Sequence, residues 1–139
     1  MHRQSPVAVV LVTHAPLGKA LYACAEHVLQ TPPSLLVADV LAADLPQPWV
    51  KKLEHEIAEL GTKQVLLLCD LYGSTPYHVA TGVQRRLSLR DYRVHLVSGV
   101  NVPMVLKALT DTSSTIEGMV TQVLAATQRG IVHQSPTLS

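Results

Sequence analysis

The chain has 139 residues, of which 47% are hydrophobic and 15% charged, and its formal net charge is +1. This length fits one domain that can bury a core without disulfide bonds or a metal, and the composition excludes a disordered chain. The longest basic runs are pairs such as Arg85-Arg86, and phenylalanine is absent. The sequence therefore gives no sign of a phosphate-tracking patch or a base-stacking platform for nucleic acid.

The first apolar run is seven residues long and rich in β-branched side chains, which is too short for a signal peptide or a membrane span. The two cysteines, Cys24 and Cys69, lack the spacing of a metal site, and we interpret both as small core residues in a reduced compartment. These observations predict a cytoplasmic protein. Its single domain is expected at residues 7–132, between short tails at residues 1–6 and 133–139.

Short runs rich in valine and leucine alternate with helix-length segments, which is the pattern of βαβ units around a parallel sheet. The predicted fold class is therefore α/β. The predicted strands are residues 7–13, 34–40, 64–70 and 93–98. The predicted helices are residues 17–29, a segment that follows Pro48 and ends before Gly61, and residues 75–87, 104–109 and 114–128.

Local signals refine the helix ends and faces. Thr75 is the predicted N-cap of the third helix, because Pro76 suits the first helical position. After the last helix, the short apolar segment at residues 130–132 predicts an edge strand. The predicted apolar stripe of the first helix consists of Leu17, Leu21, Cys24, Ala25 and Val28.

Two polar residues stand where predicted strands end. His14 directly follows the first strand, and Asp70 closes the third, beside the turn that contains Gly73. The carboxyl ends of parallel strands meet at one edge of the sheet, where α/β proteins hold their ligands. A histidine whose Nδ1 proton is held by an aspartate keeps its Nε2 lone pair free to act as a nucleophile, a general base or a metal ligand. We therefore expect His14 and Asp70 to meet in this crevice.

Hydroxyl groups and backbone amides follow both residues. Ser74 and Thr75 come shortly after Asp70, and helices begin after both strands. Helix N-termini present unpaired N–H groups, so the amides at the start of the first and third helices can hold an anion beside His14. From the residues alone, this pattern predicts a histidine that handles an anion in an α/β crevice.

Three longer motifs add to this interpretation. They are Val-Leu-Val-Thr-His-Ala-Pro-Leu-Gly-Lys-Ala around His14, Asp-Leu-Tyr-Gly-Ser-Thr-Pro-Tyr from Asp70, and Ser-Gly-Val-Asn-Val-Pro-Met up to Met104. In order and spacing they closely resemble the signature segments of the IIA component of the mannose family of the bacterial phosphotransferase system (PTS), the EIIA type-4 domain. The resemblance extends from about residue 7 to residue 132.

The resemblance implies a phosphotransferase that works without a metal or another cofactor. It accepts a phosphoryl group on a histidine from the phosphocarrier HPr and passes it to a IIB component, here on a separate chain. His14 would accept the group, Asp70 would hold its imidazole, and the Thr75 hydroxyl would lie next to the phosphoryl group. Gly73, Ser74 and Ala15 would bind the phosphoryl group.

The resemblance also implies a doubly wound sheet with helices on both faces and a homodimer that exchanges the last strand. Contact with the membrane components IIC and IID would be peripheral at most. The chain departs from the family pattern at Ala15 and Ser74, where glycines are usual, and at His78, where asparagine is usual. These differences bear on rate and partner preference.

Two other functions stay open at this point. A metal-handling protein of the small chelatase type also places a histidine after its first strand, and it would need Asp70 or His78 as a second ligand that faces His14. A regulatory phosphoprotein would use phosphorylated His14 to signal the state of the PTS to another protein. No residue indicates which sugar is involved.

Overall fold

The computed structural model of the chain describes residues 6–137, so the predicted N-terminal tail lies outside it except for Pro6. Within this range, four parallel strands form one sheet in the order β2-β1-β3-β4. The strands are β1 (Val7–His14), β2 (Leu35–Val40), β3 (Gln64–Cys69) and β4 (Arg93–Ser98). The helices are α1 (Leu17–Leu29), α2 (Pro46–Ala58), α3 (Thr75–Ser88), α4 (Val102–Thr110) and α5 (Ile116–Arg129).

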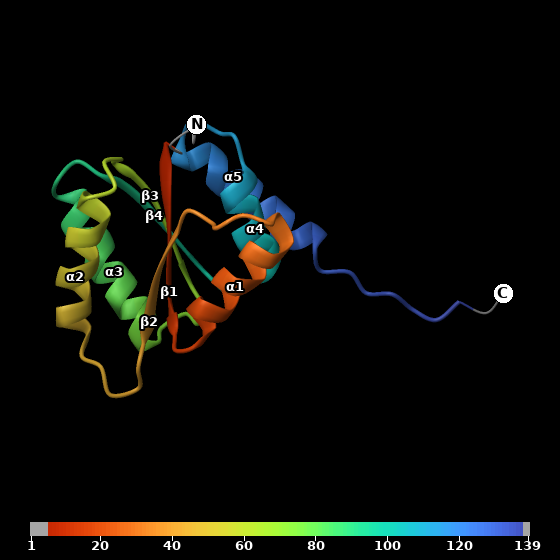
Figure 1. Ribbon diagram of the computed structural model, residues 1–139, viewed down its shortest axis with the longest axis horizontal. Helices are drawn as coiled ribbons and strands as arrows, with labels where there is room; N and C mark the ends of the chain where they lie inside the picture. The colour runs from red at the N-terminus through yellow and green to blue at the C-terminus, as the bar shows by residue number, and fades with distance from the viewer. Residues whose placement is uncertain (1–5, 138–139) are drawn as a thin grey trace.

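Helices cover both faces of the sheet. α2 and α3 lie on one face, and α1, α4 and α5 lie on the other (Figure 1). Because side chains alternate along a strand, β1 sends Val10 and Val12 into the core under α2 and α3, and Leu11 into the opposite core. All three side chains are fully buried, which explains the unbroken apolar runs in the sequence. The predicted doubly wound α/β fold is confirmed.

The order of the strands creates a crevice between β1 and β3. These strands are neighbours, but the helices that follow them, α1 and α3, cover opposite faces of the sheet (Figure 1). Such a switch point leaves a crevice outside the carboxyl ends of the strands, where α/β proteins bind their ligands. Val12 pairs with Cys69 in the β1–β3 register, so His14 and Asp70 arrive at this same edge.

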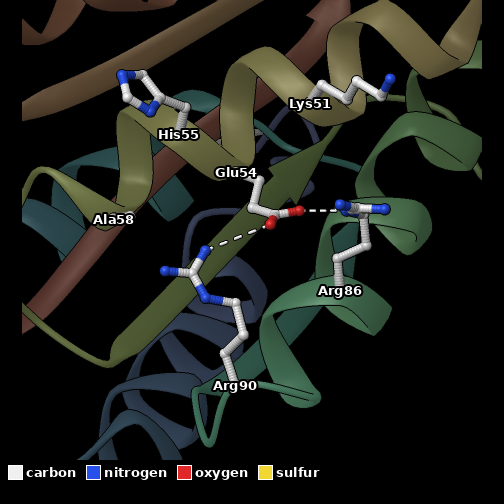
Figure 2. Close-up of a pocket in the computed structure, with 6 residues that line it drawn as sticks. All are labelled: Lys51, Glu54, His55, Ala58, Arg86 and Arg90. Carbon is white, nitrogen blue, oxygen red and sulfur yellow. Dashed lines mark hydrogen bonds and ion pairs between the residues drawn. The ribbon is translucent and has the colours of Figure 1, made fainter.

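An ion-pair cluster joins α2 to α3 at the far end of α3 from the crevice. The Glu54 carboxylate of α2 lies between two guanidinium groups and pairs with Arg86 and with Arg90 (Figure 2). The hydrogen bond from Arg86 holds the pKa of Glu54 below its usual range, against the opposing effect of burial. The surface hollow around this cluster is also lined by Lys51, His55 and Ala58.

The start of α3 differs from the prediction by one residue. Ser74, and not Thr75, is the N-cap, because its Oγ accepts a hydrogen bond from the Tyr77 N–H at 3.4 Å. Thr75 is the first helical residue and Pro76 the second. The first amides of a helix have no intrahelical acceptor, so a proline fits either position, and its presence cannot fix the cap.

The predicted edge strand at residues 130–132 is absent from the fold of the single chain. Ile131 and Val132 are 75% and 77% exposed and begin the segment that leads away from the body of the molecule (Figure 1). A strand requires a hydrogen-bonded neighbouring strand, and residues 130–132 pair with none among residues 6–137. The predicted tail has no helix or strand up to residue 137, and residues 138–139 lie outside the described range.

The buried face of α1 is displaced from the predicted stripe. Gly18, Leu21 and Ala25 are the buried residues, whereas Cys24 is exposed, so the prediction that Cys24 is a core residue is wrong. The small Gly18 lets α1 approach the sheet on its own side, which turns Cys24 toward solvent. None of the helices in the described part of the chain is long and apolar enough to cross a membrane.

Candidate active site

His14 and Asp70 are bonded to each other in two ways at the carboxyl edge of the sheet. β1 extends through His14, and β3 ends one residue before Asp70. Asp70 Oδ2 accepts a hydrogen bond from the His14 backbone N–H at 2.9 Å and lies 2.8 Å from Nδ1 of the ring. Its other oxygen, Oδ1, accepts from the Leu71 N–H at 2.9 Å. One carboxylate therefore fixes both the backbone and the ring of His14.

The electrostatics of this pair determine where the ring proton lies. Burial by itself would raise the pKa of Asp70, but the hydrogen bonds from the backbone and ring of His14 outweigh it and hold the pKa below its usual range. An ionised carboxylate can only accept, so the shared proton belongs to Nδ1 of His14. In the neutral ring Nε2 then carries a lone pair, and the His14 side chain is 48% exposed. The geometry leaves a nucleophilic nitrogen open to a partner.

Three backbone amides around the start of α1 already have acceptors within the chain. The carboxylate of Asp39 accepts from the Gly18 N–H at 2.7 Å and from the Lys19 N–H at 3.0 Å. The Ala15 N–H donates to the Val40 carbonyl at 3.0 Å. These three amides are engaged within the chain, which argues against the expectation that they bind an anion. Asp39 is not among the predicted site residues, although an acidic residue inside an apolar strand is a signal that points to it.

The start of α3 has a hydroxyl and an amide that are not hydrogen-bonded to other described residues. Gly73 adopts a φ of 81°, which turns the chain into the helix. The Ser74 hydroxyl donates to the Leu71 carbonyl at 2.7 Å and accepts from Tyr77, so it is used within the loop. The hydroxyl and the amide of Thr75 bond to no other residue in the described part of the chain. Of the two predicted hydroxyl groups, that of Thr75 is the one available to a ligand.

The candidate metal ligands, His14, Asp70 and His78, do not form the ligand set that a metal-handling protein requires. Asp70 is bonded to Nδ1 of His14. His78 is exposed on the first turn of α3, where its ring lies edge-on to Tyr77 with 5.9 Å between the centroids. Within residues 6–137, no group of three histidine, cysteine, aspartate or glutamate side chains is arranged to hold a metal ion.

His14 does not line either of two hollows on the described surface. One hollow is the α2–α3 cluster of Figure 2. Sites for small molecules are concave and enclose most of the ligand. An exposed histidine at the edge of a sheet is better suited to exchange a group with another macromolecule. The other hollow is lined by Lys19, Tyr22, Leu35 and Val37.

Comparison with known proteins agrees with this geometry. Residues 8–124 match the sequence model of the EIIA-man family, described as the PTS system fructose IIA component. The mannose-specific EIIAB component of the PTS from Escherichia coli K12 is 27% identical over 104 residues, which make up 74% of this chain and 31% of the relative. The chain thus spans about a third of the length of the curated relatives it matches.

Solved structures share the fold. The EIIA component from Streptococcus agalactiae superposes with a TM-score of 0.80 at 21% identity, over 91% of this chain and 96% of that chain. The mannose/sorbose specific IIA subunit from Enterococcus faecalis gives a TM-score of 0.79 at 20% identity, over 94% and 97%. Because the family match covers most of the sequence and includes both His14 and Asp70, the chain belongs to the EIIA-man family of PTS IIA components.

Proposed function

We propose that this protein is a phosphocarrier that accepts a phosphoryl group from phospho-HPr on Nε2 of His14 and passes it to a IIB component. The observation that carries the proposal is the 2.8 Å contact between Nδ1 of His14 and the ionised carboxylate of Asp70, which puts the proton of the neutral ring on Nδ1 and leaves the Nε2 lone pair free, on a side chain that is 48% exposed. Membership of the IIA family supports this function over the metal-handling alternative.

The chemistry follows from the open nitrogen. The Nε2 lone pair attacks phosphorus, and the bond between phosphorus and the donor breaks as the Nε2–P bond forms. Positive charge develops on the His14 ring, and the Asp70 carboxylate stabilises it through the Nδ1 hydrogen bond. We assign to the hydroxyl and amide of Thr75 and the amide of Gly73 the role of donors to the phosphoryl oxygens, beside the N-terminus of α3. The same steps in reverse deliver the group to the acceptor.

The direct test is phosphorylation by purified carriers. The protein is incubated with phosphoenolpyruvate, enzyme I and HPr, and its intact mass is measured at alkaline pH, where phosphohistidine survives. We expect a gain of one phosphoryl group on the peptide that contains His14, and no gain in His14→Ala. His27→Ala, which removes another exposed histidine, is the matched control and should still be phosphorylated. No gain in the wild-type protein, with carriers active on a known acceptor, would overturn the proposal.

The acceptor and the compartment belong to the same proposal. We expect the group to pass to a IIB component on a separate chain, with membrane components contacted peripherally at most. Cys24 and Cys69 are both unpaired, which fits the reduced cytoplasm. A regulatory use of phosphorylated His14 would require the same first step, so the phosphorylation test applies to it as well.

We also propose that the chain forms a homodimer through residues 130–132. β4 is an edge strand, so one side of its backbone presents N–H and C=O groups that no neighbouring strand pairs; among them, the Val94 carbonyl accepts from Gln84 Nε2 at 2.9 Å. Ile131 and Val132 are apolar and almost fully exposed at the end of α5. If this segment pairs with β4 of a second copy, it covers the open edge of β4 and buries Ile131 and Val132. This pairing would be the strand exchange expected from the family resemblance.

A further inference from the structure

We infer that Asp39 is a positioning residue for His14, an inference that rests on the phosphoryl transfer proposed above. Asp39 is the last but one residue of β2 and lies opposite Thr13 in the β1–β2 register. Its carboxylate binds the chain on both sides of His14. In this role Asp39 fixes the position of the His14 ring and does not itself contact the phosphoryl group.

Three hydrogen bonds connect the Asp39 carboxylate to the β1–α1 connection. Oδ1 accepts from the Thr13 hydroxyl at 2.8 Å and from the Gly18 N–H at 2.7 Å, and Oδ2 accepts from the Lys19 N–H at 3.0 Å. Thr13 is fully buried, so its hydroxyl has no solvent to replace this acceptor. Asp39 thus ties the residue that precedes His14 to the first turn of α1.

Asp39 and Asp70 hold this connection from opposite faces of the sheet. Leu11 belongs to the core under α1 and Val12 to the core under α3. Since side chains alternate along a strand, Thr13 continues the α1 face and His14 the α3 face. Asp39 therefore holds the backbone from the α1 face, whereas Asp70 bonds the amide and ring of His14 itself.

The packing around Asp39 is tight enough to define its position. A Cβ atom at Gly18 would lie 2.5 Å from Asp39 Oδ1, 2.6 Å from Val37 Cγ1 and 2.8 Å from Thr13 Oγ1. Only glycine at this position lets α1 come close enough for its amides to reach the carboxylate. Gly18 therefore contributes to the same arrangement, because its lack of a side chain makes room for the Asp39 carboxylate.

The rate of phosphoryl transfer depends on how precisely Nε2 of His14 is positioned. In-line attack on phosphorus needs Nε2 within a narrow range of positions, and a misplacement of about 1 Å can cost on the order of 100-fold in rate. Without Asp39, the β1–α1 connection loses its anchor on one face, and the two bonds from His14 to Asp70 weaken. The ring can then also adopt the tautomer with the proton on Nε2, which has no lone pair there for the attack.

The test measures single-turnover phosphoryl transfer from purified phospho-HPr to the wild-type protein, Asp39→Ala, Asp39→Asn and Asp44→Ala. Asp44 is the matched control, because this carboxylate lies shortly after β2 and accepts two hydrogen bonds, from Leu41 N–H and Trp49 Nε1–H, neither of which comes from the β1–α1 connection. We expect Asp39→Ala to lower the maximal rate about 10- to 100-fold with an unchanged half-saturating donor concentration, and Asp44→Ala to keep the wild-type rate.

The conservative variant and a spectroscopic measurement complete the test. Asp39→Asn keeps a carbonyl oxygen for Thr13 and Gly18 but cannot accept from Lys19 through its NH₂ group, so its rate should lie between wild type and Asp39→Ala. The ¹⁵N signals of the His14 ring report which nitrogen carries the proton and require no donor protein. We expect the Nδ1–H tautomer in the wild-type protein and a mixture of tautomers in Asp39→Ala.

Each outcome decides the inference. A wild-type rate for Asp39→Ala, or a slower rate with unchanged ring signals, overturns it, because Asp39 then only caps α1 or acts elsewhere. If Asp39→Ala does not fold, the rate and ring signals of Asp39→Asn decide in the same way. If the wild-type protein accepts no phosphoryl group from active phospho-HPr, the proposed function fails, and the ring signals still show whether Asp39 positions His14.

Discussion

The imidazole of His14 has two nitrogens, and only the one without a proton can attack phosphorus. Asp70 selects between them, because its pKa lies below the usual range and its carboxylate therefore accepts from Nδ1. The same oxygen accepts from the His14 backbone, so ring and main chain are fixed together. The proposed attack by Nε2 therefore depends on one carboxylate oxygen, Oδ2 of Asp70, which bonds both the ring and the backbone of His14.

Replacement of Asp70 by asparagine tests this role. The introduced side-chain amide would present an NH₂ group that donates to Nδ1, which favours the tautomer with the proton on Nε2 and removes the nucleophilic lone pair. For Asp70→Asn we expect folded protein that is phosphorylated on the order of 100-fold more slowly, or slower still, in rapid-quench measurements. Asp44→Asn serves as the control, and equal rates in the two variants would contradict the role of Asp70.

The two cysteines differ in environment, which predicts different reactivity. Burial, and then the nearby charge of Asp70, raises the pKa of the Cys69 thiol to about 11. Cys24 is exposed on α1. We expect an aromatic disulfide reagent near pH 8 to label Cys24 alone in the native protein and both thiols in denaturant. The measurement is thiol release followed by absorbance. Cys24→Ser should show no native labelling, and labelling of Cys69 in that variant would contradict the predicted environment.

At the scale of elements, the two helices beside His14 have different N-termini. The Gly18 and Lys19 amides of α1 are bonded to Asp39, whereas the amide and hydroxyl of Thr75 at the start of α3 bond to no other described residue. A helix N-terminus binds an anion only where its N–H groups lack a partner. The electrostatic contribution to phosphoryl binding is therefore expected from α3 and not from α1.

The ion pairs between α2 and α3 predict a pH-dependent contribution to stability. Hydrogen bonding to Arg86 lowers the pKa of Glu54, so its contribution is present above the unfolded pKa of about 4.3 and is lost as the pH falls through the lower folded value. Glu54→Gln should lower the free energy of unfolding by about 1 kcal/mol at neutral pH. Urea unfolding from pH 7 downward measures this difference from wild type, which should shrink in the acid range.

Glu56→Gln is the control for this prediction. Glu56 lies on the same helix, with Oε1 3.9 Å from Lys52 Nζ, and takes no part in the α2–α3 cluster. We expect little change in the free energy of unfolding of this variant at any pH. An equal effect of both substitutions would show that the Glu54 cluster does not join the helices energetically.

At the scale of the whole molecule, the switch point between β1 and β3 decides where the candidate site lies. Strand order β2-β1-β3-β4 puts β1 and β3 at the centre, so the two strands that carry His14 and Asp70 are held by neighbours on both sides. The edges of the sheet are β2 and β4, which leaves β4 free to pair with another chain. The fold thus places the candidate site between two central strands and leaves β4 at an edge of the sheet, where the proposed exchange would take place.

Truncation after Arg129 tests the proposed dimer. This variant retains all of α5 and lacks Ile131 and Val132, whose side chains lie outside the core. Light scattering at micromolar concentration should give twice the chain mass for the full-length protein and the single-chain mass for the truncated one. A single-chain mass for the full-length protein, or a dimer of the truncated protein, would contradict the proposed exchange.

The local sequence was sufficient to predict the α/β class, the approximate strands and helices, and the positions of His14 and Asp70 at strand ends. Apolar runs and helical periodicity are properties of short segments, so they can be recognised without knowledge of distant contacts. The motifs around these two residues likewise identified the family that the comparisons confirm. The sequence by itself therefore determined the architecture and the two residues at the centre of the candidate site.

Only the tertiary structure decided which groups around His14 are free. Gly18 and Asp39 are separated by 21 positions, and His14 and Asp70 by 56, yet each pair is hydrogen-bonded. Whether an amide at a helix start is open or engaged depends on such partners, and no local pattern encodes their distance or direction. The role inferred for Asp39 and the engagement of the α1 amides consequently emerge when β2 packs beside β1, because that pairing brings the carboxylate to the chain on both sides of His14.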